Sequence, residues 1–208
     1  MKSKFIFFIL FLLPFVNQAA FGDEPKATNP QMLIQTTTDE MLRQLGNNKE
    51  AIAEDSSIVM NIVEKLLIPH FAANTISRKV LGKHAKTITD EQKKKFSAAF
   101  RFYMVRFYSN AFSAYDDETI EYRSAPEYIG KKKVTIKTKL IQSGSKPVAI
   151  DYRMQRSGDS WKIIDLKIEG ISMVISNRTQ FGNKISQDGI DTVIAKLEYK
   201  NKKAQSHE

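Results

Sequence analysis

Aromatic side chains are concentrated in one segment of the chain, and this segment limits the folds that are open to it. The sequence holds 13 Phe, 7 Tyr and 1 Trp, and eight of these residues lie between positions 96 and 115. They are Phe96, Phe100, Phe102, Tyr103, Phe107, Tyr108, Phe112 and Tyr115. At about 100° per residue, the apolar side chains of a helix here spread over roughly 200°, whereas a one-sided surface helix needs a stripe of about 100°. The segment must be a helix that is buried on two sides or one that faces an internal cavity, and the pattern alone favours neither.

Helical spacing of apolar residues extends through the first half of the chain. One helix is predicted to begin at Pro30, because proline suits the first turn of a helix. A second is predicted to run to about Ile68, and a short third one to cover Asn74–Leu81. The aromatic helix opens with a capping box, in which Thr89 is the cap and Gln92 lies three residues further on. The helical part is therefore expected to span about residues 30–115.

From residue 118 onward the apolar residues alternate with polar ones, which is typical of half-buried strands. Strands are predicted over residues 119–124, 134–140, 148–154 and 161–168, with short turns between them. Such an arrangement is an antiparallel meander, and its apolar face needs a cover of helices. The predicted fold class is α+β: a curved antiparallel four-stranded sheet (meander) with helices packed over one face.

The end of the chain adds three details to this prediction. The alternation of the last strand breaks between Ile163 and Ile164, which indicates a β-bulge or burial on both faces. The stretch from Gly170 to Ile175 is apolar without a helical face, so the sheet part is expected to span about 118–175. A closing amphipathic helix is expected over about 186–199.

The N-terminal segment has the three parts of a secretory signal peptide. Lys2 and Lys4 precede an uncharged run from Phe5 to Val16, and Ala20-Phe21-Gly22 resembles a leader peptidase site. The alternative, a membrane anchor, is disfavoured because so short a run does not span a bilayer core of roughly 30 Å. We expect a signal peptide over residues 1–22 and a single domain over 23–208.

Charge and composition restrict the function further. The formal net charge is +9, and basic residues form two triplets, Lys93-Lys94-Lys95 and Lys131-Lys132-Lys133. A basic surface is often merely solvated, and it also suits an acidic protein or an anionic membrane. Nucleic acid is disfavoured, because the chain is expected to be exported and no exposed aromatics interleave with the lysines. The sequence has no cysteine, which excludes disulfides and thiolate metal sites.

No constellation of residues predicts catalysis or metal binding. None of the three histidines has a second ligand at metal spacing, and Ser172 lacks the surroundings of a serine nucleophile. Asp165 is the one candidate, because it lies in an apolar strand and such folds can host an aspartate base for isomerisation. The alternative is that Asp165 ties down a neighbouring loop or pairs with a lysine or arginine. We therefore predict no catalytic residues, no metal and no cofactor.

Motifs spread over most of the chain resemble one family. They are Leu81-Gly82, Thr89-x-x-Gln92, Phe96-x-x-x-Phe100, Tyr108, Trp161, Asp165, Glu169-Gly170-Ile171-Ser172-Met173, Phe181 and Gly189. From about Pro30 to Leu197, the chain is similar to MlaC, the toluene-tolerance family of periplasmic phospholipid-binding proteins. It departs from the family at Lys83-His84-Ala85, where aromatics are common.

The resemblance implies a soluble, periplasmic phospholipid carrier that is not an enzyme and uses no cofactor. Such carriers shuttle lipid between the outer and inner membranes and maintain outer-membrane lipid asymmetry. The implied partners are phospholipid, an outer-membrane lipoprotein–porin complex, and an inner-membrane ABC transporter complex with its membrane-anchored substrate-binding subunit. A hopanoid carrier, an isomerase-like enzyme on a cone-shaped fold and a structural domain with a filled core remain as alternatives.

A carrier of this kind needs a deep apolar pocket, because each methylene group exposed to water costs about 0.8 kcal/mol. The aromatic helix, the inward rows of the strands and the stretch after Gly170 are the sequence features that supply apolar side chains. The predicted lipid-binding residues are Phe96, Phe100, Tyr103, Met104, Phe107, Val134, Ile136, Leu140, Val148, Ile150, Tyr152, Trp161, Ile171 and Met173.

Overall fold

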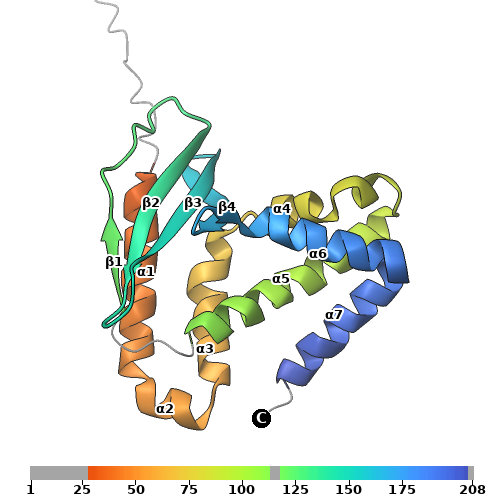
Figure 1. Ribbon diagram of the computed structural model, residues 1–208, viewed down its shortest axis with the longest axis horizontal. Helices are drawn as coiled ribbons and strands as arrows, with labels where there is room; N and C mark the ends of the chain where they lie inside the picture. Colours follow the sequence, from red (N-terminus) through yellow and green to blue (C-terminus); the bar gives the residue numbers. More distant parts are fainter. Residues whose placement is uncertain (1–27, 113–117, 206–208) are drawn as a thin grey trace, which may run out of the picture.

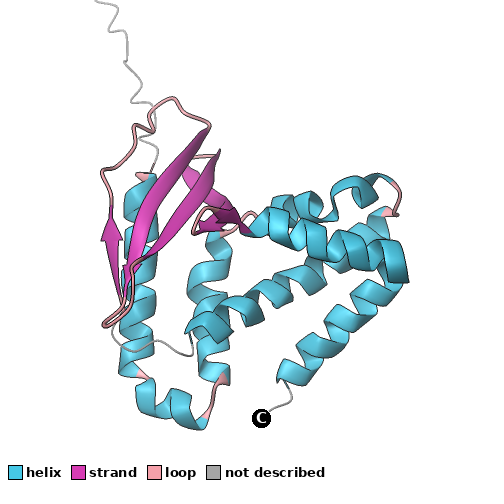
Figure 2. Ribbon diagram, viewed as in Figure 1, coloured by secondary structure: helices cyan, strands magenta, loops and turns pink. Residues whose placement is uncertain are grey.

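The computed structural model describes residues 28–112 and 118–205, so the predicted signal peptide and its cleavage site lie outside the described residues. This part of the chain has the predicted α+β architecture (Figures 1 and 2). The strands form one antiparallel sheet in the order β1-β2-β3-β4-β5. None of the helices within the described residues is long and apolar enough to cross a membrane.

The helices before the sheet follow the predicted order with one additional break. They are α1 (Pro30–Asn47), α2 (Lys49–Glu54), α3 (Ser57–Ile62), the π-helix η1 (Val63–Leu67), the 3-10 turn η2 (Ile68–His70), α4 (Ala73–Leu81), the 3-10 turn η3 (Gly82–Lys86) and α5 (Asp90–Phe112). Asn29 caps α1, since its side chain accepts hydrogen bonds from the backbone N–H groups of Gln31 and Met32. The single helix predicted to reach Ile68 is interrupted at Asp55, whose backbone is extended.

The two alternatives predicted for the aromatic helix, a helix buried in the core and one that faces a cavity, each apply to a different part of α5. The predicted capping box is present: Thr89 N–H donates to Gln92 Oε1 at 3.0 Å, and Gln92 N–H donates to Thr89 Oγ1 at 3.1 Å. In the first half of α5, the Phe181 ring from the later helix α6 (Met173–Asp188) packs edge-on against Phe96 and Phe100, with ring centroids 5.7 Å apart in both pairs. This part is filled core, whereas the C-terminal end of α5 borders a cavity.

The sheet has five strands, one more than predicted. They are β1 (Thr119–Tyr122), β2 (Lys133–Ile141), β3 (Val148–Ser157), β4 (Ser160–Ile168) and β5 (Ile171–Ser172). The fifth strand pairs Ile171 with Ile168 and Ser172 with Lys167. It follows a turn at Glu169 and Gly170, both of which have positive φ angles of 49° and 79°. A strand of two residues is too short to show an alternating pattern, so the sequence does not reveal it.

The irregularity predicted in the last long strand is a bulge at Ile164. Arg153 pairs with Asp165 and Met154 pairs with Ile163, which leaves Ile164 without a partner on β3. The extra residue lets Ile163 and Leu166 face the same side of the sheet, although they are separated by an odd number of positions.

The prediction for the end of the chain was wrong in its boundaries. The sheet ends at Ser172, and two helices follow: α6 (Met173–Asp188) and α7 (Ile190–Gln205). Ser172 caps α6, since its Oγ accepts a hydrogen bond from the Ile175 N–H. The buried residues of α6 are Val174, Phe181 and Ile185, a stripe too narrow to be recognised among polar residues.

The sheet and the later helices lie on two sides of α5. Figure 1 shows α1 running along the sheet, while α4, α6 and α7 gather on the other side, and α5 crosses from that group to the end of α3. The inner face of the sheet is therefore covered by α1, η1 and the C-terminal end of α5, and its outer face carries charged residues.

Candidate functional site

An apolar cavity lies between the inner face of the sheet, α1 and the C-terminal end of α5. Its volume is about 270 Å³. Its lining residues come from two helices, η1 and four strands: Thr38, Met41, Leu42, Leu67, Phe107, Tyr108, Ala111, Phe112, Glu118, Ile120, Leu140, Val148, Ile150, Tyr152, Leu166 and Ile168. We refer to it as the sheet cavity.

The walls of the sheet cavity are almost free of charge. Burial raises the pKa values of the Tyr108 and Tyr152 hydroxyls, so both phenols stay neutral at physiological pH. Glu118 is the single ionisable carboxyl group in the lining, and it accepts a hydrogen bond from Gln142 Nε2 at 3.0 Å. Such a cavity suits an apolar ligand, with polar contacts limited to a few points.

A second, much smaller cavity adjoins the first on the side of α4 and α6. Its volume is about 20 Å³, which is room for about one water molecule. Phe107, Tyr108 and Leu166 line both cavities and form the wall between them. Phe107 is 41% exposed and Leu166 is buried, so the Phe107 ring is the loosely packed part of this wall.

The structure divides the predicted lipid-binding residues into four groups, and Phe107 lines both cavities. Phe107, Leu140, Val148, Ile150 and Tyr152 line the sheet cavity, and Phe100, Tyr103, Met104 and Met173 line the small one. Phe96, Val134, Ile136 and Trp161 are buried and line neither cavity, and Ile171 is 60% exposed.

Trp161 shows why periodicity overestimates the site. Its side chain is 0% exposed, and its indole N–H donates to the Thr28 carbonyl at 2.9 Å, so it fills space next to the start of α1. Periodicity identifies residues that point inward, but it does not reveal whether that space is filled. For the same reason, the sequence does not reveal that inward-facing residues of α1 and β4, such as Met41 and Leu166, line the cavity.

Asp165 has a structural role, as the alternative to catalysis predicted. Its carboxylate is 4% exposed and accepts hydrogen bonds from Ser172 Oγ at 2.7 Å and from the Val174 N–H at 3.1 Å. Arg153 forms an ion pair with it at 3.4 Å. Asp165 thereby ties β4 to the first turn of α6, where a negative charge is favoured by the helix dipole.

Potential metal ligands do not cluster within the described residues. Within 28–112 and 118–205, no three His, Asp or Glu side chains lie close enough to bind an ion. His70 is half-buried at the end of η2, and burial together with the Lys162 cation lowers its pKa.

Comparison with known proteins agrees with this arrangement. A family model described as MlaC protein matches residues 35–199. The chain is 26% identical over 174 residues to the intermembrane phospholipid transport system binding protein MlaC of Haemophilus influenzae, a match that covers 82% of this chain and 81% of the relative. It is 26% identical over 166 residues to a toluene tolerance protein of Pseudomonas putida, covering 79% and 77% of the two chains.

The fold is also found in a solved structure. The phospholipid-binding protein from Ralstonia solanacearum, in complex with a phospholipid, superposes with a TM-score of 0.74 at 22% identity, covering 84% of this chain and 98% of that one. The family match spans the sheet cavity, the α5 capping box and the Asp165 network. The chain therefore belongs to the MlaC protein family.

Proposed function

We propose that this protein binds a phospholipid in the sheet cavity and carries it through the periplasm between the outer and inner membranes. The observation that supports this most directly is the largely apolar cavity of about 270 Å³ in a chain with a relative named for phospholipid transport. A carrier removes acyl chains from water, which would otherwise cost about 0.8 kcal/mol for each methylene group.

The proposal assigns different roles to the predicted residues. Phe107, Leu140, Val148, Ile150 and Tyr152 contact the acyl chains, since they line the sheet cavity. The buried residues outside the cavity act by holding the surrounding core. No cofactor and no bond-changing step are part of the proposal. The proposed partners are the outer-membrane lipoprotein–porin complex and the inner-membrane ABC transporter complex, and the proposed role is to maintain outer-membrane lipid asymmetry.

The size of the cavity adds a conformational element. At about 270 Å³, it lies just below the range of roughly 300–1,000 Å³ that is typical of ligand pockets. We infer that a two-tailed lipid enlarges it by displacing Phe107 and Tyr108, which would join the two cavities. The half-exposed Phe107 ring is the part of this wall that has solvent to move into.

Organic extraction of the purified protein tests the function. We expect protein exported to the periplasm to yield a stoichiometric amount of phospholipid, identified by mass spectrometry. Extraction should also lower the midpoint of thermal unfolding, because a ligand at about 100 times its Kd stabilises the native state by about 2.7 kcal/mol. If extraction instead yields a stoichiometric amount of a hopanoid, the carried lipid is a hopanoid and not a phospholipid. Protein without any lipid, whose unfolding does not respond to added phospholipid, would contradict it.

Export itself is tested by the mass of the mature chain. The small residues Ala20 and Gly22 predict cleavage after Gly22, so the mature protein is expected to begin at Asp23. Intact-mass measurement on the periplasmic fraction checks this. A chain that retains residues 1–22 and remains in the inner membrane would rule out a carrier that diffuses between membranes.

A further inference from the structure

The two lysine triplets of the sequence lie in different electrostatic surroundings. Lys93 pairs with Asp90 at 2.8 Å, and Lys95 pairs with Glu91 at 2.9 Å, so carboxylates offset most of the first triplet. In contrast, none of the ion pairs within residues 28–112 and 118–205 involves Lys131, Lys132 or Lys133. The second triplet is therefore a concentration of charge that the fold leaves unbalanced.

This charge continues into a groove on the outer face of the sheet. The groove has a volume of about 200 Å³ and is lined by Lys133, Val134, Thr135, Arg153, Met154 and Ile164. Lys79 of α4 faces the same region: its pKa is lowered first by burial and then by the cations of Arg153 and Lys133. Asp165 pairs with Arg153 at 3.4 Å, but its carboxylate also accepts hydrogen bonds from Ser172 and Val174, so it offsets these cations only in part.

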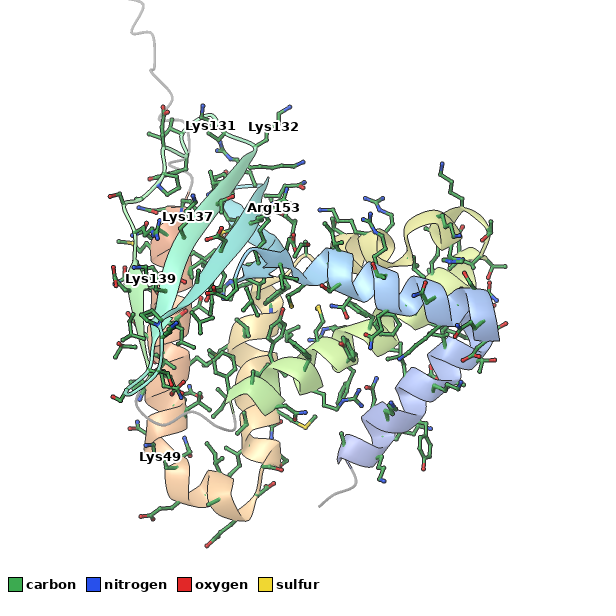
Figure 3. All side chains as sticks on the ribbon, viewed as in Figure 1. Lys49, Lys131, Lys132, Lys137, Lys139 and Arg153 are labelled. Carbon is green, nitrogen blue, oxygen red and sulfur yellow. The ribbon has the colours of Figure 1, made fainter. Side chains whose placement is uncertain are left out.

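Further along β2 the outer face is better balanced. Lys137 lies opposite Asp151 on β3, and Lys139 lies opposite Glu121 on β1. Figure 3 shows both lysines on the strand, away from Lys131 and Lys132 at its beginning. The unbalanced positive charge is thus confined to the end of the sheet at which β2 starts.

An apolar side chain projects beside the second triplet. The connection from β1 to β2 extends beyond the end of the sheet (Figure 1), and Lys131 and Lys132 point outward from it (Figure 3). Within it, Lys131 N–H donates to the Tyr128 carbonyl at 3.1 Å and closes a tight turn. Ile129 in this turn is 77% exposed, more than any other large apolar side chain of the described residues. An exposed apolar tip flanked by lysines is the composition of a membrane-surface contact.

We propose that this end of the molecule, formed by Ile129, Lys131, Lys132, Lys133 and Arg153, is a docking site for an anionic lipid bilayer. The lysines and Arg153 meet lipid phosphates, and Ile129 enters between the head groups. Each basic residue near an anionic membrane contributes about 1 kcal/mol, which makes binding reversible and salt-sensitive. An acidic protein surface could also bind these cations, but it would not explain why Ile129 is exposed at the tip.

The docking site is separate from the sheet cavity. Lys133 begins β2, and the cavity-lining Leu140 follows seven residues later, at a distance of roughly 24 Å along the strand. Docking at this end holds the protein at a membrane without using the cavity. The proposal therefore does not rest on the proposed lipid-carrying function, and lipid-loaded and lipid-free protein should dock equally well.

The test is sedimentation of the mature protein with vesicles of phosphatidylglycerol and phosphatidylcholine, against vesicles of phosphatidylcholine alone. At low ionic strength, the triple variant Lys131→Gln, Lys132→Gln, Lys133→Gln should bind the anionic vesicles about 100-fold more weakly, from three residues at about 1 kcal/mol each. The matched variant Lys93→Gln, Lys94→Gln, Lys95→Gln loses the same formal charge and should change by less than about 3-fold, because Lys93 and Lys95 are already paired with carboxylates.

A second variant distinguishes a bilayer from an acidic protein surface. Ile129→Ser should weaken binding to anionic vesicles about 10-fold, since it removes apolar contact, and should leave binding to immobilised polyglutamate unchanged. Equal losses in the two triple variants would show that only net charge matters and would overturn the proposal. An Ile129→Ser variant that binds vesicles like the unmodified protein would also overturn it, in favour of an acidic protein partner.

Discussion

Ile150→Trp is expected to remove co-purifying phospholipid almost completely while leaving the protein folded. Ile150 lies near the start of β3, lines the sheet cavity and is only partly buried. An indole ring at this position occupies space inside the cavity of about 270 Å³, and an apolar cavity of this kind has no ordered polar network to disrupt. The ring therefore competes with acyl chains and does not overpack a filled core.

Ile136→Trp is the matched control for this experiment. Ile136 is on the neighbouring strand and the same face of the sheet, but it is 0% exposed and lines neither cavity. Adding volume there overpacks the core and should lower the free energy of unfolding by about 1–3 kcal/mol, while the folded fraction still binds lipid. Native mass spectrometry measures lipid content, and calorimetry on delipidated protein measures stability. Full lipid content in Ile150→Trp would mean that the ligand binds elsewhere.

Asp165→Ala is expected to lower the free energy of unfolding by about 3 kcal/mol, because it leaves buried hydrogen-bond donors unpaired. The donors are the Ser172 hydroxyl and the Val174 N–H. The ion pair with Arg153 adds little, since the guanidinium side chain is 45% exposed. Denaturant titration measures the change. Asp165→Asn keeps an acceptor for the Val174 N–H and should recover part of the loss.

Asp151→Ala provides the comparison, because Asp151 lies two residue pairs from Asp165 along the sheet and forms no ion pair within the described residues. Its effect is expected to stay within about 0.5 kcal/mol. Equal stability of the Asp165 and Asp151 variants would contradict the structural role of Asp165. Loss of lipid from folded Asp165→Asn would show that the carboxylate acts on the ligand and not only on the junction of β4 and α6.

Features that depend on neighbouring residues along the chain could be predicted from the sequence. The capping box at Thr89 and Gln92 satisfies backbone donors within one helical turn, so its residue types alone identify it. The alternation in β2 and β3 identifies their inward rows, because successive side chains of a strand point to opposite faces. The bulge at Ile164 was visible as a break in that alternation.

Other features required the packed molecule. The helix α6 has few buried residues and begins directly after a two-residue strand, so its start depends on the hydrogen bonds of Ser172 and Asp165 across the junction. The sheet cavity is the clearest case. Trp161 and Ile150 both belong to inward-facing rows, yet the first fills space and the second borders a void. Periodicity reports the direction in which a side chain points. A cavity is the part of an enclosed space that side chains leave unfilled. That space is enclosed only once α1, α5 and the sheet are assembled.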